Sequence, residues 1–131
     1  MFRKKTALAT PQIIEPTTLT PTNANSYINR AYIYHSRGDF LHAEEDILQA
    51  LSMDSTLVEA HYALGLNLKA QNRPDEAVQA FQKALEQLNR AEKENPTRTH
   101  MLTRIIKGHI NQLTKGNWDL RKEFWGTIGE K

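Results

Sequence analysis

Histidines are the residues of this chain whose type most readily suggests chemistry, because imidazole binds metals and transfers protons near neutral pH. The chain has five of them: His35, His42, His61, His100 and His109. A zinc site on a helix needs two histidines four residues apart together with a carboxylate partner, and no pair here has that spacing. We therefore expect surface or packing histidines and no bound metal.

The acidic residues and the glycines do not indicate catalysis either. Glu44, Glu45 and Asp46 are consecutive, so on a helix their carboxylates point in different directions, and we predict a solvated helix face. The chain has no cysteine, no glycine-rich loop that could hold a phosphate and no Gly-x-Ser-x-Gly sequence around a nucleophilic serine. The sequence therefore predicts a protein that is not an enzyme and that needs no cofactor.

Basic residues near the C-terminus suggest an alternative function, the electrostatic binding of nucleic acid or another polyanion. Phosphate binding needs clustered positive charge, and aromatic rings can stack on bases. Two tryptophans, Trp118 and Trp125, lie among the following basic residues: Arg98, Arg104, Lys107, Lys115, Arg121 and Lys122. The tryptophans follow helical spacing, so we interpret them as core residues and the basic residues as a solvated face.

The composition is that of a single globular domain. The chain has 131 residues, of which 39% are apolar and 24% are charged, and its formal net charge is +2. No apolar run approaches the roughly 20 residues that cross a bilayer. The basic start of the chain reaches Thr10 and Pro11 before an apolar stretch of signal-peptide length can form. We therefore expect neither membrane insertion nor secretion, and take the cytoplasm as the location.

Two consecutive segments, residues 24–57 and 58–91, align without a gap at a period of 34 residues. The aligned positions are small or apolar in both copies: Ala31 with Gly65, Ala43 with Ala77, Ala50 with Ala84, Leu51 with Leu85 and Ile47 with Phe81. Small residues let two helix backbones approach to ~8–10 Å, and larger residues one turn away fill the space beside them. The pattern predicts one helical hairpin in each segment.

Turn residues occur at matching positions of the two segments. Gly38 and Asn72 stand between the predicted helices, and both residue types tolerate the left-handed conformation that ends a helix. Asp39 can cap the helix after the first turn, and Pro74 can begin the helix after the second. Each segment is therefore predicted to be helix, turn, helix.

The second segment resembles a tetratricopeptide repeat. The resemblance rests on three stretches: Ala60-His61-Tyr62-Ala63-Leu64-Gly65, Pro74-Asp75-Glu76-Ala77 and Phe81-Gln82-Lys83-Ala84-Leu85. The first segment is similar to the family too, although Arg30 stands where the family usually has leucine and Ser55 stands where it often has proline, as does Asn89 in the second segment. The resemblance implies an all-α superhelix of about three helix-turn-helix units that acts without catalysis.

A third unit is expected, because fewer than about three repeats rarely bury enough surface to be stable. Aligning Gly116 with Gly38 places a degenerate repeat or capping hairpin at residues 97–129, after an insertion around residues 92–101. In this alignment His109 and Arg121 occupy positions that are small in the family, so we expect no tight helix crossing there.

The predicted domain organisation has two parts. Residues 1–22 are rich in proline and threonine, a composition that disfavours helix, and we predict a flexible tail. Residues 23–131 form the predicted helical domain, with its repeats and the degenerate third unit.

The resemblance also implies where a partner binds, because the first helices of tetratricopeptide repeats line a concave groove that holds a peptide or helix of another protein. The positions that face the groove are, in this chain, Ile28, Tyr32, His35, Tyr62, Leu66, Lys69, Ile106, Ile110 and Leu113. Most are apolar, and monomeric proteins rarely expose an apolar patch beyond a few hundred Å² without a use for it. We expect the partner to be another protein that offers an apolar peptide or an amphipathic helix.

Two other occupants of the groove stay open at this point. The chain's own tail could cover the groove through Ile13, Ile14 and Leu19, or a second copy of the chain could do so in a symmetric dimer. One subfamily of co-chaperones grips a C-terminal carboxylate with lysine and asparagine in the groove. Ile28 and Tyr32 stand at those positions here, so we do not expect that clamp. The sequence thus predicts an adaptor, scaffold or assembly chaperone.

Overall fold

The computed structural model describes residues 15–90 and 95–119. Within these residues every regular element is helical, which confirms the all-α prediction. The elements are a short 3-10 helix, η1 (Pro16–Thr18), and the α-helices α2 (Ala24–Ser36), α3 (Phe40–Met53), α4 (Val58–Ala70), α5 (Pro74–Arg90) and α6 (Pro96–Lys115). The first repeat therefore contains α2 and α3, and the second contains α4 and α5.

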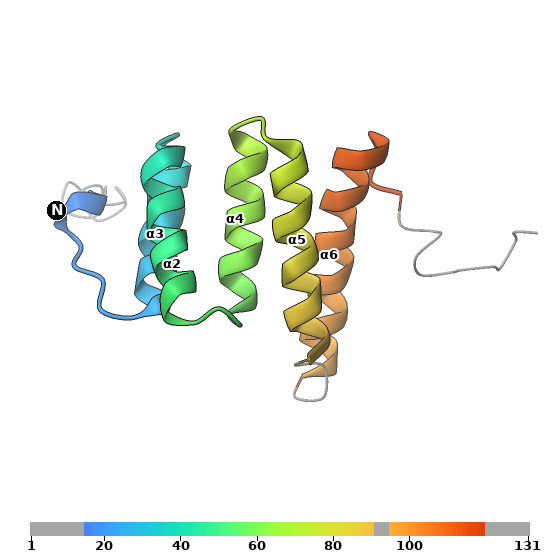
Figure 1. Ribbon diagram of the computed structural model, residues 1–131, viewed down its shortest axis with the longest axis horizontal. Helices are drawn as coiled ribbons and strands as arrows, with labels where there is room; N and C mark the ends of the chain where they lie inside the picture. The colour runs from blue at the N-terminus through green and yellow to red at the C-terminus, as the bar shows by residue number, and fades with distance from the viewer. Residues whose placement is uncertain (1–14, 91–94, 120–131) are drawn as a thin grey trace, which may run out of the picture.

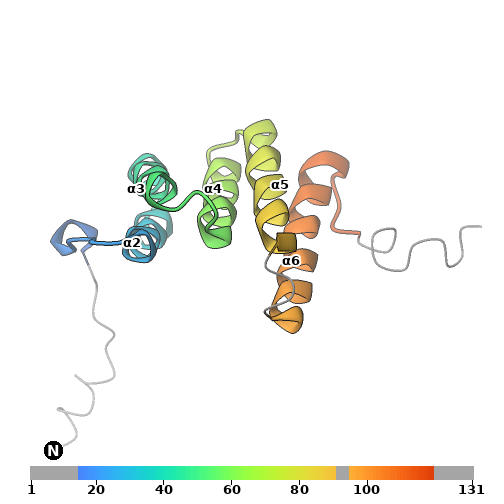
Figure 2. The same ribbon diagram turned by 60° about the horizontal axis from the view of Figure 1, so that its bottom comes forward.

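The helices stack in chain order, and helices adjacent in sequence run in opposite directions (Figure 1). In the turned view, α2, α4 and α6 lie in one layer and α3 and α5 lie in the other (Figure 2). The most extensive packing lies within the pairs α2–α3 and α4–α5, while α4 also packs on α3, and α6 on α5. Two hairpins are therefore stacked side by side, and α6 takes the place of the first helix of a third unit.

The turns within the hairpins have the predicted conformation. Gly38 and Asn72 have φ angles of +78° and +61°, which lie in the left-handed region. Asp39 caps α3, because its side chain accepts a 3.3 Å hydrogen bond from the backbone N–H of His42. The helix α5 begins at Pro74, whose missing N–H costs nothing at that position.

The helices of the second hairpin approach closely where the sequence has its smallest residue. A Cβ atom on Gly65 would lie 2.5 Å from the ring of Phe81, so the ring occupies the space that any other side chain would need. Phe81 is fully buried (0%). The small residues of the alignment are almost or fully buried as well: Ala31, Ala43, Ala50, Ala77 and Ala84. The predicted pattern of small residues at the helix crossings and larger residues beside them is confirmed for both hairpins.

A buried polar side chain joins the two hairpins. Asn67 on α4 is fully buried, and its Nδ2 donates a hydrogen bond of 2.7 Å to the backbone carbonyl of Phe40 at the start of α3. Its Oδ1 lies 3.1 Å from Nδ1 of His35 on α2. Because an amide oxygen can only accept a hydrogen bond, Nδ1 of His35 carries the proton and donates the hydrogen bond to Oδ1 of Asn67. One side chain therefore holds both helices of the first hairpin against α4.

An ion pair of Arg30 and Asp46 links the two helices of the first hairpin. Nε and Nη2 of Arg30 each donate a 2.7 Å hydrogen bond to a different carboxylate oxygen of Asp46. The sequence predicts a solvated face for Asp46, but this residue is buried (5%), because its partner lies across the hairpin on α2. Glu44 also differs from that prediction, since its side chain is only 19% exposed and pairs with Arg73 at 2.9 Å. The ion pair explains how this repeat accommodates an arginine in place of the family's usual leucine.

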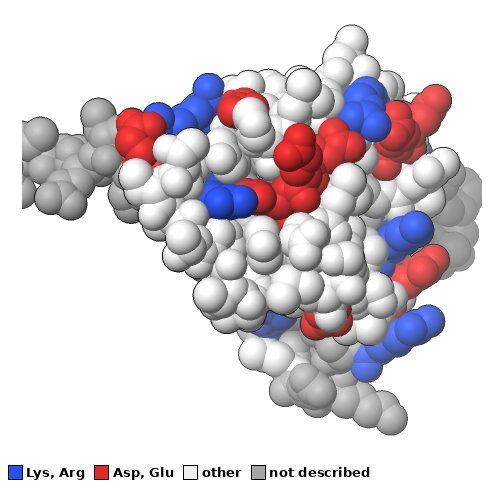
Figure 3. All heavy atoms as spheres, turned by 60° about the vertical axis from the view of Figure 1, so that its left-hand side comes forward, with Lys and Arg blue, Asp and Glu red and all other residues white. Residues whose placement is uncertain are grey.

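The segment before α2 lies against the N-terminal end of the stack (Figure 1). Pro16 in η1 is buried, Nη1 of Arg30 donates a 3.2 Å hydrogen bond to the carbonyl of Leu19, and Arg37 pairs with Glu15 at 3.1 Å. Residues 15–22 of the predicted tail are therefore held by α2 at its outer side. Ile13 and Ile14 lie outside the described residues. Figure 3 looks at this end and shows basic and acidic side chains mixed together rather than a field of one sign.

The helix α6 begins one residue before the predicted third unit, inside the expected insertion. Asn95 caps it by accepting a 3.1 Å hydrogen bond from the backbone N–H of Arg98, and Pro96 is its first residue, so much of the expected insertion is helical. It ends at Gly116, which is left-handed with φ +79°. The small residue of α6 is Gly108, not His109: the indole of Trp118 occupies the space that a Cβ on Gly108 would need. The remainder of the predicted third unit, from residue 120 onward, lies outside the described residues.

Replacing Arg30 by leucine should destabilise the fold strongly, because the carboxylate of Asp46 would stay buried without its partner. We expect Arg30→Leu to lower the free energy of unfolding by about 3 kcal/mol, and the double variant Arg30→Leu/Asp46→Leu to recover most of that loss. Arg37→Leu is the control, since it removes the exposed pair with Glu15 and should cost less than about 1 kcal/mol. Urea unfolding followed by circular dichroism measures all three. Equal costs for Arg30→Leu and Arg37→Leu would contradict the buried pair.

Alanine at position 65 should destabilise the second hairpin although alanine is the better helix former. The added Cβ meets the Phe81 ring at 2.5 Å, and we expect Gly65→Ala to cost about 1–3 kcal/mol in the same unfolding measurement. In a Phe81→Leu background the smaller neighbour leaves room, so the cost of the alanine should shrink or change sign. A cost that is identical in both backgrounds would show that the ring is not its cause.

Candidate functional site

The predicted groove residues of α2, α4 and α6 fall into two classes. Ile28 is 2% exposed and packs in the core with Ala60 and Ala63 of the next repeat, and Ile106 is 0% exposed and packs in the core with Phe81 and Leu88. These two isoleucines therefore offer no surface to a partner, because the stacking of neighbouring helices uses them. The other seven are at least partly exposed, and we call them the first-helix face: Tyr32, His35, Tyr62, Leu66, Lys69, Ile110 and Leu113.

Tyr32 is the most exposed aromatic residue of the first-helix face, at 38%. Its side chain lines a small cavity together with Ala63 and Leu66. The cavity has a volume of about 10 Å³, which is enough for about one water molecule and too small for a partner's side chain. Partial burial, followed by the negative charge of Glu59 and then by Tyr62, raises the pKa of Tyr32 to about 12. The hydroxyl is therefore a firm hydrogen-bond donor at neutral pH.

His35 presents a defined group to the same face. Its Nδ1 donates to the buried Asn67, so the neutral ring keeps an unprotonated Nε2 that can accept a hydrogen bond. The ring also packs edge-on against Phe40, with centroids 5.1 Å apart. Asn67 thus selects the tautomer of a residue that it also positions, as a partner of a histidine often does.

His109 is a residue of this site whose role the sequence analysis missed. Its ring stacks on Phe81 with centroids 5.0 Å apart and an interplanar angle of 7°, and Trp118 packs edge-on against its other side at 4.8 Å. Nζ of Lys69 lies 3.2 Å from its Nδ1, and because an ammonium can only donate, Nδ1 accepts and Nε2 carries the proton. Nε2 faces the hydroxyl of Tyr62 at 3.5 Å. Burial, followed by the charge of Lys69, lowers the pKa of His109 to about 4.

Side chains bridge α4 to α6 at both ends of this face. Nζ of Lys69 donates a 2.6 Å hydrogen bond to Oε1 of Gln112, and Arg98 pairs with Glu59 at 2.8 Å. Lys69 is therefore a bridge between helices as well as a groove residue. The sequence signal that could have predicted these contacts is Gly108. If the third unit is aligned one residue earlier, Gly108 rather than His109 stands at the small position, and His109 then lies on the side of α6 that faces α4.

The remaining chemistry predictions can be compared with the described residues. His61 is nearly buried, with Nε2 2.8 Å from the carbonyl of Ser55, whereas His42 and His100 are exposed. Within residues 15–90 and 95–119, no three histidine, aspartate or glutamate side chains gather in a way that could hold a metal ion.

Trp118, interpreted as a core residue, is 43% exposed, because its ring covers only one side of α6. Trp125, Arg121 and Lys122 lie outside the described residues.

Membrane insertion has no candidate helix in the part of the chain that the structure describes. None of those helices combines the length and the apolar character that crossing a bilayer requires.

Comparison with known proteins agrees with the geometry of the two hairpins. Models of the tetratricopeptide repeat match residues 24–57 and 58–91, which together make up just over half of the chain. The chain belongs to the tetratricopeptide repeat family. The boundaries of the matches are those predicted from the 34-residue period. The family is one of protein–protein interaction modules, so the exposed side chains of the first-helix face are the candidate binding residues.

One relative extends the match beyond the two repeats. The small glutamine-rich tetratricopeptide repeat-containing protein 2 of Saccharomyces cerevisiae is 34% identical over 86 residues, which is 66% of this chain and 25% of that protein. The chain therefore spans about a quarter of the length of this relative. No solved structure matches the chain.

The neutral state of His109 should make the fold sensitive to acid. Its pKa is lowered in the folded state, so between about pH 4 and 6.5 the unfolded chain binds more protons than the folded chain does. The contribution of the neutral ring to the free energy of unfolding is therefore fully present above pH 6.5 and is lost as the pH falls toward 4. Because the ring is only half-buried, we expect solvent screening to limit the loss to about 1–2 kcal/mol. The imidazole resonance of His109 should titrate near pH 4 by NMR. His109→Phe should flatten the pH dependence of urea unfolding by that amount, and an ordinary midpoint near 6.5 would contradict the packing described.

Proposed function

We propose that this chain is a non-catalytic protein-binding module that holds an apolar peptide or an amphipathic helix of another protein on its first-helix face. The observation that carries the proposal is the combination of partly exposed apolar and aromatic side chains on parallel helices, Tyr32 on α2 and Tyr62 and Leu66 on α4. An aromatic ring with a polar tip suits a surface that is alternately wet and covered. Binding energy would come from apolar area removed from water, at roughly 25 cal/mol per Å², less the cost of ordering the ligand.

The polar groups on this face complement a peptide backbone. The hydroxyl of Tyr32 stays protonated and donates, and Nε2 of His35 accepts, so the two can serve a carbonyl and an N–H of a bound chain. Lys69 supplies a positive charge in the last turn of α4, next to Gln112. These groups would orient a ligand whose affinity comes from the apolar contacts.

The wider role follows only from the family. A module of this kind fits an adaptor, a scaffold or an assembly chaperone, and we propose the cytoplasm as its location. The name of the yeast relative describes a tetratricopeptide repeat protein and no partner, and this chain spans a quarter of that protein, so the relative does not identify a partner for this chain. The chain's own N-terminal segment and a second copy are competing occupants. The described part of that segment, through Leu19, lies at the end of the stack beside Arg30 rather than on the first-helix face.

A second candidate function is electrostatic binding of nucleic acid or another polyanion through α6. The observation that favours it is the composition of this helix, which contains Arg98, Arg104, Lys107 and Lys115 and no aspartate or glutamate. Arg98 is engaged by Glu59, which lowers the charge available there. The two candidates differ in salt dependence, because phosphate contacts weaken steeply with added salt whereas apolar contacts do not.

Aspartate at the centre of the first-helix face should abolish partner binding without unfolding the chain. We would select a peptide for the purified protein from a random displayed library and measure its dissociation constant by fluorescence anisotropy. Leu66→Asp should weaken binding at least about ten-fold, because a charge would face the apolar contact. The matched control is Leu48→Asp, the same change at a 49% exposed leucine on α3 in the other layer, which should leave the affinity unchanged.

The same peptide distinguishes the two functions. Raising the salt concentration from 50 to 500 mM should change its affinity little, whereas a loss of several orders of magnitude would favour the polyanion interpretation. If every selected peptide binds both aspartate variants equally, the first-helix face is not the binding surface.

A further inference from the structure

One side of α2 is ordered by aromatic rings and arginines. Four residues spaced three and four apart lie along it, and we call them the end stripe: Tyr27, Arg30, Tyr34 and Arg37. The guanidinium carbon of Arg30 lies 5.8 Å from the ring centroids of both Tyr27 and Tyr34, so the cation is held between two aromatic rings. The end stripe shares no residue with the first-helix face.

The segment before α2 lies along the end stripe. Glu15 pairs with Arg37 at 3.1 Å, and the carbonyl of Leu19 accepts a 3.2 Å hydrogen bond from Nη1 of Arg30. Between these two contacts the chain forms η1, which contacts α2, and Pro16 in η1 is buried. The segment is therefore fixed on α2 at both of its ends and between them.

The second hairpin shows what this side of a first helix does when another hairpin precedes it. The aligned residues of α4, 34 positions later, are His61, Leu64, Leu68 and Gln71. Nε2 of His61 lies 2.8 Å from the carbonyl of Ser55, and Nε2 of Gln71 donates a 3.0 Å hydrogen bond to Glu44 on α3. Leu64 packs against the core of the first hairpin. The segment before α2 therefore contacts α2 at positions where α4 contacts the preceding hairpin.

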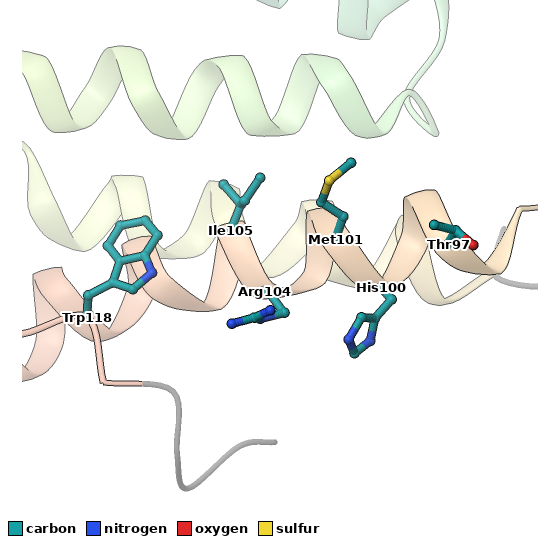
Figure 4. Close-up of a pocket in the computed structure, with 6 residues that line it drawn as sticks. All are labelled: Thr97, His100, Met101, Arg104, Ile105 and Trp118. Carbon is teal, nitrogen blue, oxygen red and sulfur yellow. The ribbon is translucent and has the colours of Figure 1, made fainter. Parts of the chain in front are cut away.

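We propose that residues 15–19 are a cap that takes the place of a preceding hairpin, and that the end stripe pairs with a second copy of this chain when the cap is released. A stack of repeats needs a cap, because its terminal helix would otherwise expose the surface through which repeats pack. Among the described residues, α6 at the other end of the stack carries a cavity of about 390 Å³, and Met101 and Trp118 in its lining are 57% and 43% exposed (Figure 4). On the end stripe, by contrast, Tyr34 is 9% exposed.

A second copy suits the end stripe because the charges at this end of the stack have both signs. Asp46 pairs with Arg30 at 2.7 Å, and acidic and basic side chains are mixed over this end (Figure 3). A two-fold contact places a surface opposite itself, so a field of one sign would repel its copy, whereas a mixed surface can pair with it. The tethered cap competes at an effective concentration in the millimolar range, so we expect the unaltered chain to be monomeric.

A charge in place of the buried proline tests the cap in the full-length chain. Pro16→Lys adds a positive charge at the end stripe, beside its arginines, and should release residues 15–19. The matched control is Thr17→Lys, the same charge at the neighbouring, exposed residue of η1. Hydrogen exchange of the hydrogen-bonded amides of η1 measures release, and sedimentation equilibrium measures self-association.

We expect Pro16→Lys to speed exchange in η1 and to self-associate at least about ten-fold more tightly than the unaltered chain, while Thr17→Lys stays monomeric. Fast exchange without self-association would overturn the proposal, and so would unchanged exchange or equal association of the two variants. If Pro16→Lys loses helix content, Glu15→Arg decides, because it opposes Arg37 with a like charge. It should associate, and Glu15→Arg/Arg37→Glu should restore the monomer; a monomeric Glu15→Arg would then overturn the proposal. These outcomes do not depend on peptide binding at the first-helix face.

Discussion

Close contact between helix backbones is the constraint on which the rest of this structure depends. In the second hairpin the Phe81 ring lies where a side chain on residue 65 would be, and the corresponding residues of the first hairpin are the buried Ile47 and Ala31. Close packing of this kind keeps each pair of helices in one relative position, because interiors at crystal-like density do not tolerate small shifts. The orientation of the first helices, and of everything they expose, follows from it.

The stacking of one hairpin on the next is decided by polar as well as apolar contacts. Asn67 is fully buried and bonds to two helices of the preceding hairpin, and a buried amide with satisfied partners specifies one arrangement, since any other would leave it unpaired. The same contact sets the tautomer of His35, which lies on the first-helix face. At the next junction His109 is held between Phe81 and Trp118. The contacts that pack one repeat on the next therefore also position the polar side chains of the candidate site.

The helices, the turns and the two repeats could be predicted because they depend on local patterns. Gly38 and Asn72 ended helices as their backbone preferences require, and the 34-residue period located both hairpins. The third unit was harder. Aligning it on Gly116 put His109 at the position that is small in the family, so no tight crossing was expected there. Trp118 packs instead on Gly108, one residue earlier, and α6 runs up to the residue directly before Gly116, whereas α2 and α4 end two residues before Gly38 and Asn72.

For this protein, amino-acid order by itself determined the helical class, the hairpin boundaries and the set of positions on the first helices. Tertiary structure decided which of those positions are available. Ile28 and Ile106 have the same character in the sequence as Leu66, yet neighbouring helices bury the first two and leave the third half-exposed. Asp46 and Lys69 likewise appear as surface charges until the fold brings Arg30 and His109 beside them. Exposure and pairing depend on residues distant in sequence, and a local pattern cannot contain them.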